Sequence, residues 1–147
     1  MINTNTNNIN QLKSGFNTAT PLNINWFQHT NVTNDFELSS QYAHICHQHK
    51  QEKKWLLFIN PEETSIEKLA NTHGVDVSKI LMVNYKSSVA NRAKIALAQI
   101  TSVLSKGNCS AVILSNSLFN ADEIAELEIS AKKGKTHCFL MEQCQLH

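Results

Sequence analysis

The sequence is poor in glycine, which limits the kinds of site it can build. It has four glycines among 147 residues, namely Gly15, Gly74, Gly107 and Gly134. A phosphate-binding loop needs glycines close together, because bare backbone N–H groups must approach the phosphate. These four are too far apart to form a Walker-type loop or a dinucleotide fingerprint. We therefore expect no nucleotide bound by the usual route and no other cofactor.

A strong charge of one sign and a long apolar run are also missing. The net charge is +1, and no long block of lysine and arginine occurs. This balance argues against nucleic acid as a partner. The longest apolar runs, such as residues 55–59, are far shorter than the roughly 18 residues that cross a bilayer. No basic start followed by an apolar stretch marks a secretory signal. We expect a cytoplasmic protein that binds neither nucleic acid nor membrane.

The cysteines do not form a recognisable redox motif. Cys46, Cys109, Cys138 and Cys144 contain no Cys-x-x-Cys pair. In the cytosol they would remain thiols. Cys109 and Cys138 lie in apolar segments, so we interpret them as small buried core residues.

Arrangements typical of catalysis are absent as well. The sequence has no Gly-x-Ser-x-Gly elbow. One cluster has ligand chemistry: His44, Cys46, His47 and His49. His44 and His47 would share a helix face, but Cys46 would point elsewhere and no matched second half-site appears. A small metal- or thiol-dependent enzyme is therefore the weakest alternative. We expect a polar helix end, no metal site and no enzymatic activity.

Residues 1–34 have a composition of their own. They are rich in asparagine and threonine, and Lys13 carries their only charged side chain. Such a polar tract buries too little apolar area to offset the entropy of ordering it. We predict a disordered tail over 1–34 and a single domain over 35–147. Trp26 and Phe27 would dock on the body of that domain or, alternatively, on a partner.

From residue 35 onward, helical and strand patterns alternate. The apolar spacing predicts helices over 35–50 and 64–73, a longer one from Ser87 or Ser88 to Gly107, and one over 121–134. Short apolar runs predict strands over 55–59, 80–83, 111–114 and 136–141. Strands separated by helices pair in parallel through crossover connections. The sequence thus predicts an α/β fold with a small, mainly parallel sheet and flanking helices.

Local signals mark the helix ends. Thr64 with Glu67, and Asn120 with Glu123, fit capping boxes. Gly74, Gly107 and Gly134 stand where helices should stop. The unpaired edges of the sheet, or the first helix, would suit a homodimer contact.

Several segments stand in a fixed order between residues 54 and 141. Residues 53–61 read KKWLLFINP, residues 74–83 read GVDVSKILMV, and residues 106–113 read KGNCSAVI. The order closes with EIAEL at 123–127, an Ala-x-x-Gly spacing at 131–134, and FLM at 139–141. This set resembles the SulA family of DNA-damage-induced inhibitors of cell division. The family has a basic-Trp-x-Leu-aromatic-aliphatic-x-Pro strand, a Gly-Leu-Pro-Leu-x-Lys-Val-Met run, and a Gly-Asn followed by Ser-Val-Val-Ile.

The resemblance implies both a fold and a function. The fold would be RecA-like without the phosphate loop, which agrees with the scarcity of glycine. The protein would act in the SOS response as a homodimer that binds FtsZ, sequesters it and blocks septation. A RecA-like accessory protein of DNA-damage repair, binding a recombinase or polymerase, is the alternative.

Family contact positions carry over to four residues. Lys79 matches the family lysine, and Lys54 replaces an arginine, although the two are not equivalent in a bidentate contact. Ile59 replaces a leucine, and Leu69 stands where the family has tryptophan, so a binding hot spot could be lost. For Ile59 and Leu69, a position in the core is an equal alternative to a partner contact. The final His147 matches the histidine that helps the Lon protease recognise SulA-type chains, although the residue before it differs.

Overall fold

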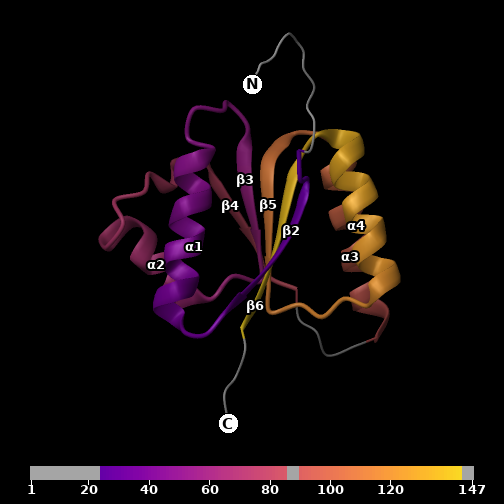
Figure 1. The fold of residues 1–147 in the computed structure, drawn as a ribbon, viewed down its shortest axis with the longest axis horizontal. Helices are drawn as coiled ribbons and strands as arrows, with labels where there is room; N and C mark the ends of the chain where they lie inside the picture. The colour runs from indigo at the N-terminus through magenta and orange to yellow at the C-terminus, as the bar shows by residue number, and fades with distance from the viewer. Residues whose placement is uncertain (1–23, 86–89, 144–147) are drawn as a thin grey trace, which may run out of the picture.

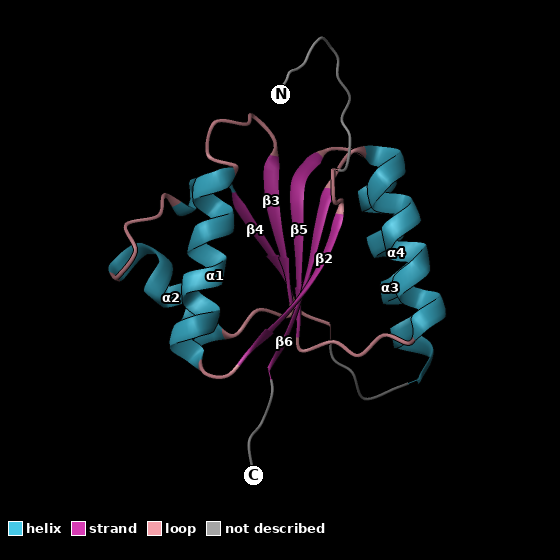
Figure 2. Cartoon of the chain, viewed as in Figure 1, coloured by secondary structure: helices cyan, strands magenta, loops and turns pink. Residues whose placement is uncertain are grey.

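The protein folds as a three-layer α/β sandwich (Figures 1 and 2). The computed structural model describes residues 24–85 and 90–143. Five parallel strands form one sheet in the order β2-β6-β5-β3-β4. The strands are β2 (Phe27–Val32), β3 (Trp55–Ile59), β4 (Ile80–Val83), β5 (Cys109–Ser115) and β6 (His137–Gln143).

Two helices cover each face of the sheet (Figure 2). They are α1 (Asp35–Gln48), α2 (Glu63–Asn71), α3 (Ala90–Lys106) and α4 (Ala121–Gly134), and a short 3₁₀ turn, η1 (Val77–Lys79), precedes β4. The predicted start of α3 at Ser87 or Ser88 lies outside the described residues. None of the described helices is long and apolar enough to cross a membrane.

Side chains of the central strands alternate between two cores. In β3, Leu56 and Phe58 pack with α1 and α2, whereas Leu57 and Ile59 pack with α3 and α4. The continuous apolar runs are explained by this double burial, since both faces of a parallel sheet are covered. The four predicted strands and their parallel pairing are confirmed. Cys109 and Cys138 are buried, as expected.

The predicted boundary of the tail is wrong at its C-terminal end. Residues Phe27–Val32 form the edge strand β2 and pair in register with β6. Asn34, also assigned to the tail, caps α1 by accepting a hydrogen bond from the Glu37 N–H. Trp26 packs against the core between the sheet and α3/α4, which confirms docking on the domain itself. Residues 1–23 lie outside the described residues.

Two helix ends differ from the sequence prediction. Thr64 lies inside the first turn of α2, and Glu62 occupies the N-cap without a side-chain hydrogen bond. By contrast, the capping box of Asn120 and Glu123 is present. Helix α4 does end at Gly134, but the left-handed residue after it is Lys135, with φ 52°.

Candidate functional site

The carboxyl end of the sheet is where α/β proteins usually bind phosphates. Here Asn60, at the end of β3, adopts φ 51° and ties neighbouring segments together. Its side-chain oxygen accepts a hydrogen bond from the Tyr85 N–H at 2.6 Å, and its carbonyl accepts one from the Asn116 side chain at 2.8 Å. Glu62 and Glu63 then begin α2, so carboxylates stand where an anion would sit. The loop after β3 is therefore held by its own hydrogen bonds and carries negative charge, so its geometry does not suit a phosphate.

The histidine cluster at the end of α1 is divided between surface and core. His44 and His47 are exposed, whereas Cys46 and His49 are buried. Burial raises the pKa of the Cys46 thiol to about 11, which keeps it protonated and a poor metal ligand. Within residues 24–85 and 90–143, no group of three or more potential ligands lies close enough to hold a metal ion.

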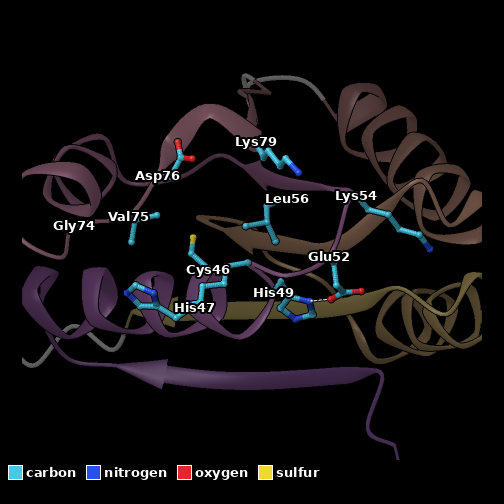
Figure 3. A pocket seen from close by; sticks show the side chains of 11 residues that line it. Cys46, His47, His49, Glu52, Lys54, Leu56, Gly74, Val75, Asp76 and Lys79 are labelled. Atoms are coloured by element: carbon cyan, nitrogen blue, oxygen red, sulfur yellow. Dashed lines mark hydrogen bonds and ion pairs between the residues drawn. The ribbon is translucent and has the colours of Figure 1, made fainter.

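A groove opens at the amino end of the sheet, on the side of α1 and α2 (Figure 3). Its cavity measures about 360 Å³. Three chain segments line it: the end of α1 with the loop to β3 and the start of β3, the loop after α2, and the end of η1. Leu56 and Val75 lie among the side chains lining the cavity, and Lys50, Lys54 and Lys79 contribute positive charge. We call this cavity the lysine groove.

Two of the four predicted contact residues meet at this groove. Lys54 precedes β3 and Lys79 precedes β4, and both are exposed. The two strands pair in parallel, so their first residues lie at the same edge of the sheet. The structure thus brings together two lysines that are 25 positions apart in the numbering.

The other two predicted contact residues are buried in separate cores. Ile59 is 2% exposed and packs between the sheet and α3/α4. Leu69 is a fully buried residue of α2 itself and packs on the opposite face of the sheet. Neither side chain offers surface to a partner in this conformation, and both act as core residues here. His147 lies outside the described residues.

The acidic groups of the lysine groove are occupied by other partners. The Glu52 carboxylate pairs with the Nδ1 atom of His49 at 2.5 Å. Asp76 accepts a hydrogen bond from the Ser78 N–H at 3.0 Å, and this bond is the main cause of its lowered pKa. No lysine lies within 4.0 Å of a carboxylate in the described part of the chain, but Lys79 is near enough to Asp76 for its charge to contribute to the lowered pKa of that carboxyl.

His137, the first residue of β6, lies between His49, which lines the groove, and Trp26, which precedes β2. Its ring lies 5.2 Å from the ring of His49 and 4.7 Å from that of Trp26, measured between centroids. Desolvation by burial lowers the pKa of His137, and the neighbouring His49 lowers it further. A neutral His137 therefore suits this packing.

Sequence reasoning missed Lys50 and Asp76 as groove residues. Lys50 lies in the loop before β3 and Asp76 in the loop before η1 and β4, and only the fold brings these two loops to one cavity. A signal was present for Lys50, because the chain between a helix end and a parallel strand start must lie at the amino edge of the sheet.

Apolar side chains are exposed close to this end of the molecule. Trp55 is 45% exposed at the start of β3, and Val77 is 43% exposed in η1. On the edge strand β4, Leu81 is 43% and Met82 51% exposed, on opposite faces of the sheet. Such a strand edge is open to pairing with another chain.

Comparison with known proteins identifies the fold. By sequence, the chain matches no protein-family profile and no curated protein. By structure, it is similar to the crystal structure of SulA from Pseudomonas aeruginosa, with a TM-score of 0.64 and 17% sequence identity. The match covers 80% of this chain and 98% of that chain. The protein thus has a SulA-like fold.

Proposed function

We propose that this protein inhibits bacterial cell division by binding FtsZ and sequestering it from the septal ring. The structural likeness to SulA carries the proposal, since it extends over nearly all of that protein. The meeting of Lys54 and Lys79 at one groove supports it, because the sequence resemblance had singled out these two residues as partner contacts. The proposed action is stoichiometric binding in the cytoplasm, without catalysis or a cofactor.

A division phenotype tests this function. Expression of the full chain in its own host is expected to give filamentous cells that lack FtsZ rings while chromosomes still segregate. As part of the SOS response, the transcript is expected to rise after DNA damage. Normal division at a level of chain several-fold above that of FtsZ contradicts the proposal and favours the repair-accessory alternative.

We further propose a homodimer that forms through the β4 edge. Of the two edges, β2 carries polar residues and an ion pair between His29 and Glu142, whereas β4 exposes Leu81 and Met82. Pairing of two β4 edges covers both side chains, one on each face. Light scattering is expected to give the dimer mass, and Leu81→Lys to give the monomer. Gln28→Lys on β2 is the matched control, and a monomeric wild-type chain contradicts the dimer.

Turnover by the Lon protease is proposed through the terminal His147. Residues appended after His147 are expected to lengthen the half-life of the chain in cells. An unchanged half-life, or one independent of Lon, contradicts this role.

A further inference from the structure

The edge strand β2 is held differently at its two ends. At its carboxyl end, Val32 is fully buried and Asn34 caps α1, so this end is tied to the core. At its amino end, two contacts with β6 attach the chain. The N–H of Cys138 donates a hydrogen bond of 2.7 Å to the Trp26 carbonyl, and the Trp26 ring lies 4.7 Å from the His137 ring, measured between centroids. We call these two contacts the Trp26 latch.

Little else covers the Trp26 latch. Residues 24 and 25, which precede it, are exposed, and the Trp26 side chain is half-buried. Within residues 24–85 and 90–143, β2 is the outermost strand and pairs with β6 alone. Opening the latch therefore costs the packing of Trp26 on the core beside α3 and α4, but it leaves the other four strands paired.

The ring of His137 lies among three other aromatic rings. Besides Trp26, these are His49 at 5.2 Å and Phe139 at 6.2 Å, measured between centroids. His49 and Phe139 are buried, so neither can move away without disturbing the core. Trp26, Phe139 and Ala111, the β5 residue in register with His137, carry no charge. Of the three rings, that of Trp26 leaves at the lowest cost.

A proton on His137 is disfavoured while the latch is closed. Burial is the largest cause of the lowered pKa of this ring, and the charge of His49 at the end of α1 lowers it further. Glu52 and the backbone of Asn25 act in the opposite direction, but they do not offset the burial. A state in which water reaches the ring binds the proton at the ordinary pKa of 6.5, so acid favours that state.

We propose that a proton on His137 opens the Trp26 latch, which detaches the amino end of β2 and uncovers the neighbouring edge of β6. The buried carboxyl end of β2 stays in place, so the strand swings outward while the domain remains folded. At neutral pH the latch is closed and the β6 edge is covered. An uncovered strand edge is open to pairing with another chain. This inference does not depend on the proposed function.

The fluorescence of Trp26 in the full chain tests the latch. The chain has two tryptophans, so Trp55→Phe leaves Trp26 as the only one. The pH is lowered from about 8 to about 5, the range in which histidine titrates. Emission from Trp26 is expected to shift to the red, and its quenching by acrylamide to rise several-fold, with a midpoint below pH 6.5. Far-ultraviolet circular dichroism should stay constant, because the domain does not unfold.

Two variants in the Trp55→Phe chain assign this transition. His137→Phe keeps an aromatic ring that takes no proton, and it should abolish the transition. His29→Gln removes the histidine of β2 that pairs with Glu142 of β6, and it should leave the transition in place.

Hydrogen exchange in the unsubstituted chain reports the same opening. The protection factor of the Cys138 amide, which bonds to the Trp26 carbonyl, should fall on acidification. The Asn60 amide bonds to the Val83 carbonyl at the other edge of the sheet, and its protection factor should not change. Three results overturn the inference: no fluorescence transition in the Trp55→Phe chain, the same transition in His137→Phe, or a transition that coincides with the loss of circular dichroism.

Discussion

At the scale of single residues, the absent side chain of Gly134 determines how closely α3 and α4 pack. A Cβ atom at this position would lie 1.7 Å from the carbonyl oxygen of Leu104. That carbonyl also accepts a hydrogen bond from the Thr136 hydroxyl at 3.0 Å. Glycine was correctly identified from sequence as the end of the helix, but its reason is close approach and not a left-handed backbone. No local pattern reports how near another helix will lie.

Gly134→Ala is expected to destabilise the protein by about 3 kcal/mol, because two helices must separate to admit the methyl group. Gly74→Ala is the control. Its φ of 65° also disfavours alanine, but nothing lies within 4 Å of the added Cβ. The control should lose only about 1 kcal/mol. Urea unfolding measures both, and equal losses contradict the close-approach account.

His137 is expected to make stability depend on pH. Its pKa is lowered from the usual 6.5 in the folded protein, so the unfolded chain binds the proton more readily. The contribution of the neutral His137 to the free energy of unfolding is complete above pH 6.5. It is lost as the pH falls through the folded-state pKa of His137. His137→Gln should flatten this part of the curve of unfolding free energy against pH. A wild-type slope in His137→Gln contradicts the assignment.

At the scale of secondary structure, the elements with a helical apolar spacing or a continuous apolar run were predictable from sequence, and β2 was not. The central strands show continuous apolar runs because both of their faces are buried. In β2, only Val32 is fully buried, and the strand is held largely by backbone pairing with β6. Pairing with a distant strand leaves no pattern in a polar sequence. The same limit applies to the lysine groove, whose three segments meet only in the fold.

Two truncations test the corrected boundary. Removal of residues 1–23 is expected to change the free energy of unfolding by less than about 0.5 kcal/mol, because a tract of this polar composition buries little apolar area. Removal of residues 1–33 should cost more than about 3 kcal/mol, because it exposes the β6 edge and deletes the buried Val32. Calorimetry or urea unfolding compares them. Equal stability of the two truncated chains contradicts a structural role for β2.

Helix caps provide a second comparison between elements. Asn120→Ala should lower the free energy of unfolding by about 1 kcal/mol, since it removes a capping box. Thr64→Ala should change it by less than about 0.5 kcal/mol, because Thr64 is not the N-cap of α2. A larger loss for Thr64→Ala, measured by urea unfolding, contradicts the observed start of α2.

At the scale of the whole molecule, the fold separates two ends with different chemistry. The carboxyl end is closed by Asn60 and its hydrogen bonds, where related architectures bind phosphate. The amino end carries the lysine groove and unpaired positive charge. The fold class followed from alternating patterns in the sequence. The placement of Lys54 beside Lys79, and the burial of Ile59 and Leu69, needed the three-dimensional arrangement.

Assembly of purified cognate FtsZ with GTP, followed by light scattering, tests the central claim most directly. Added wild-type protein should reduce polymer in proportion to the amount added, as expected for sequestration. Lys79→Glu should inhibit much less, whereas Thr64→Glu, with a new charge at the other end of the molecule, should inhibit like wild type. Unchanged assembly at a several-fold excess of the wild-type protein would contradict the account and leave only the shared fold.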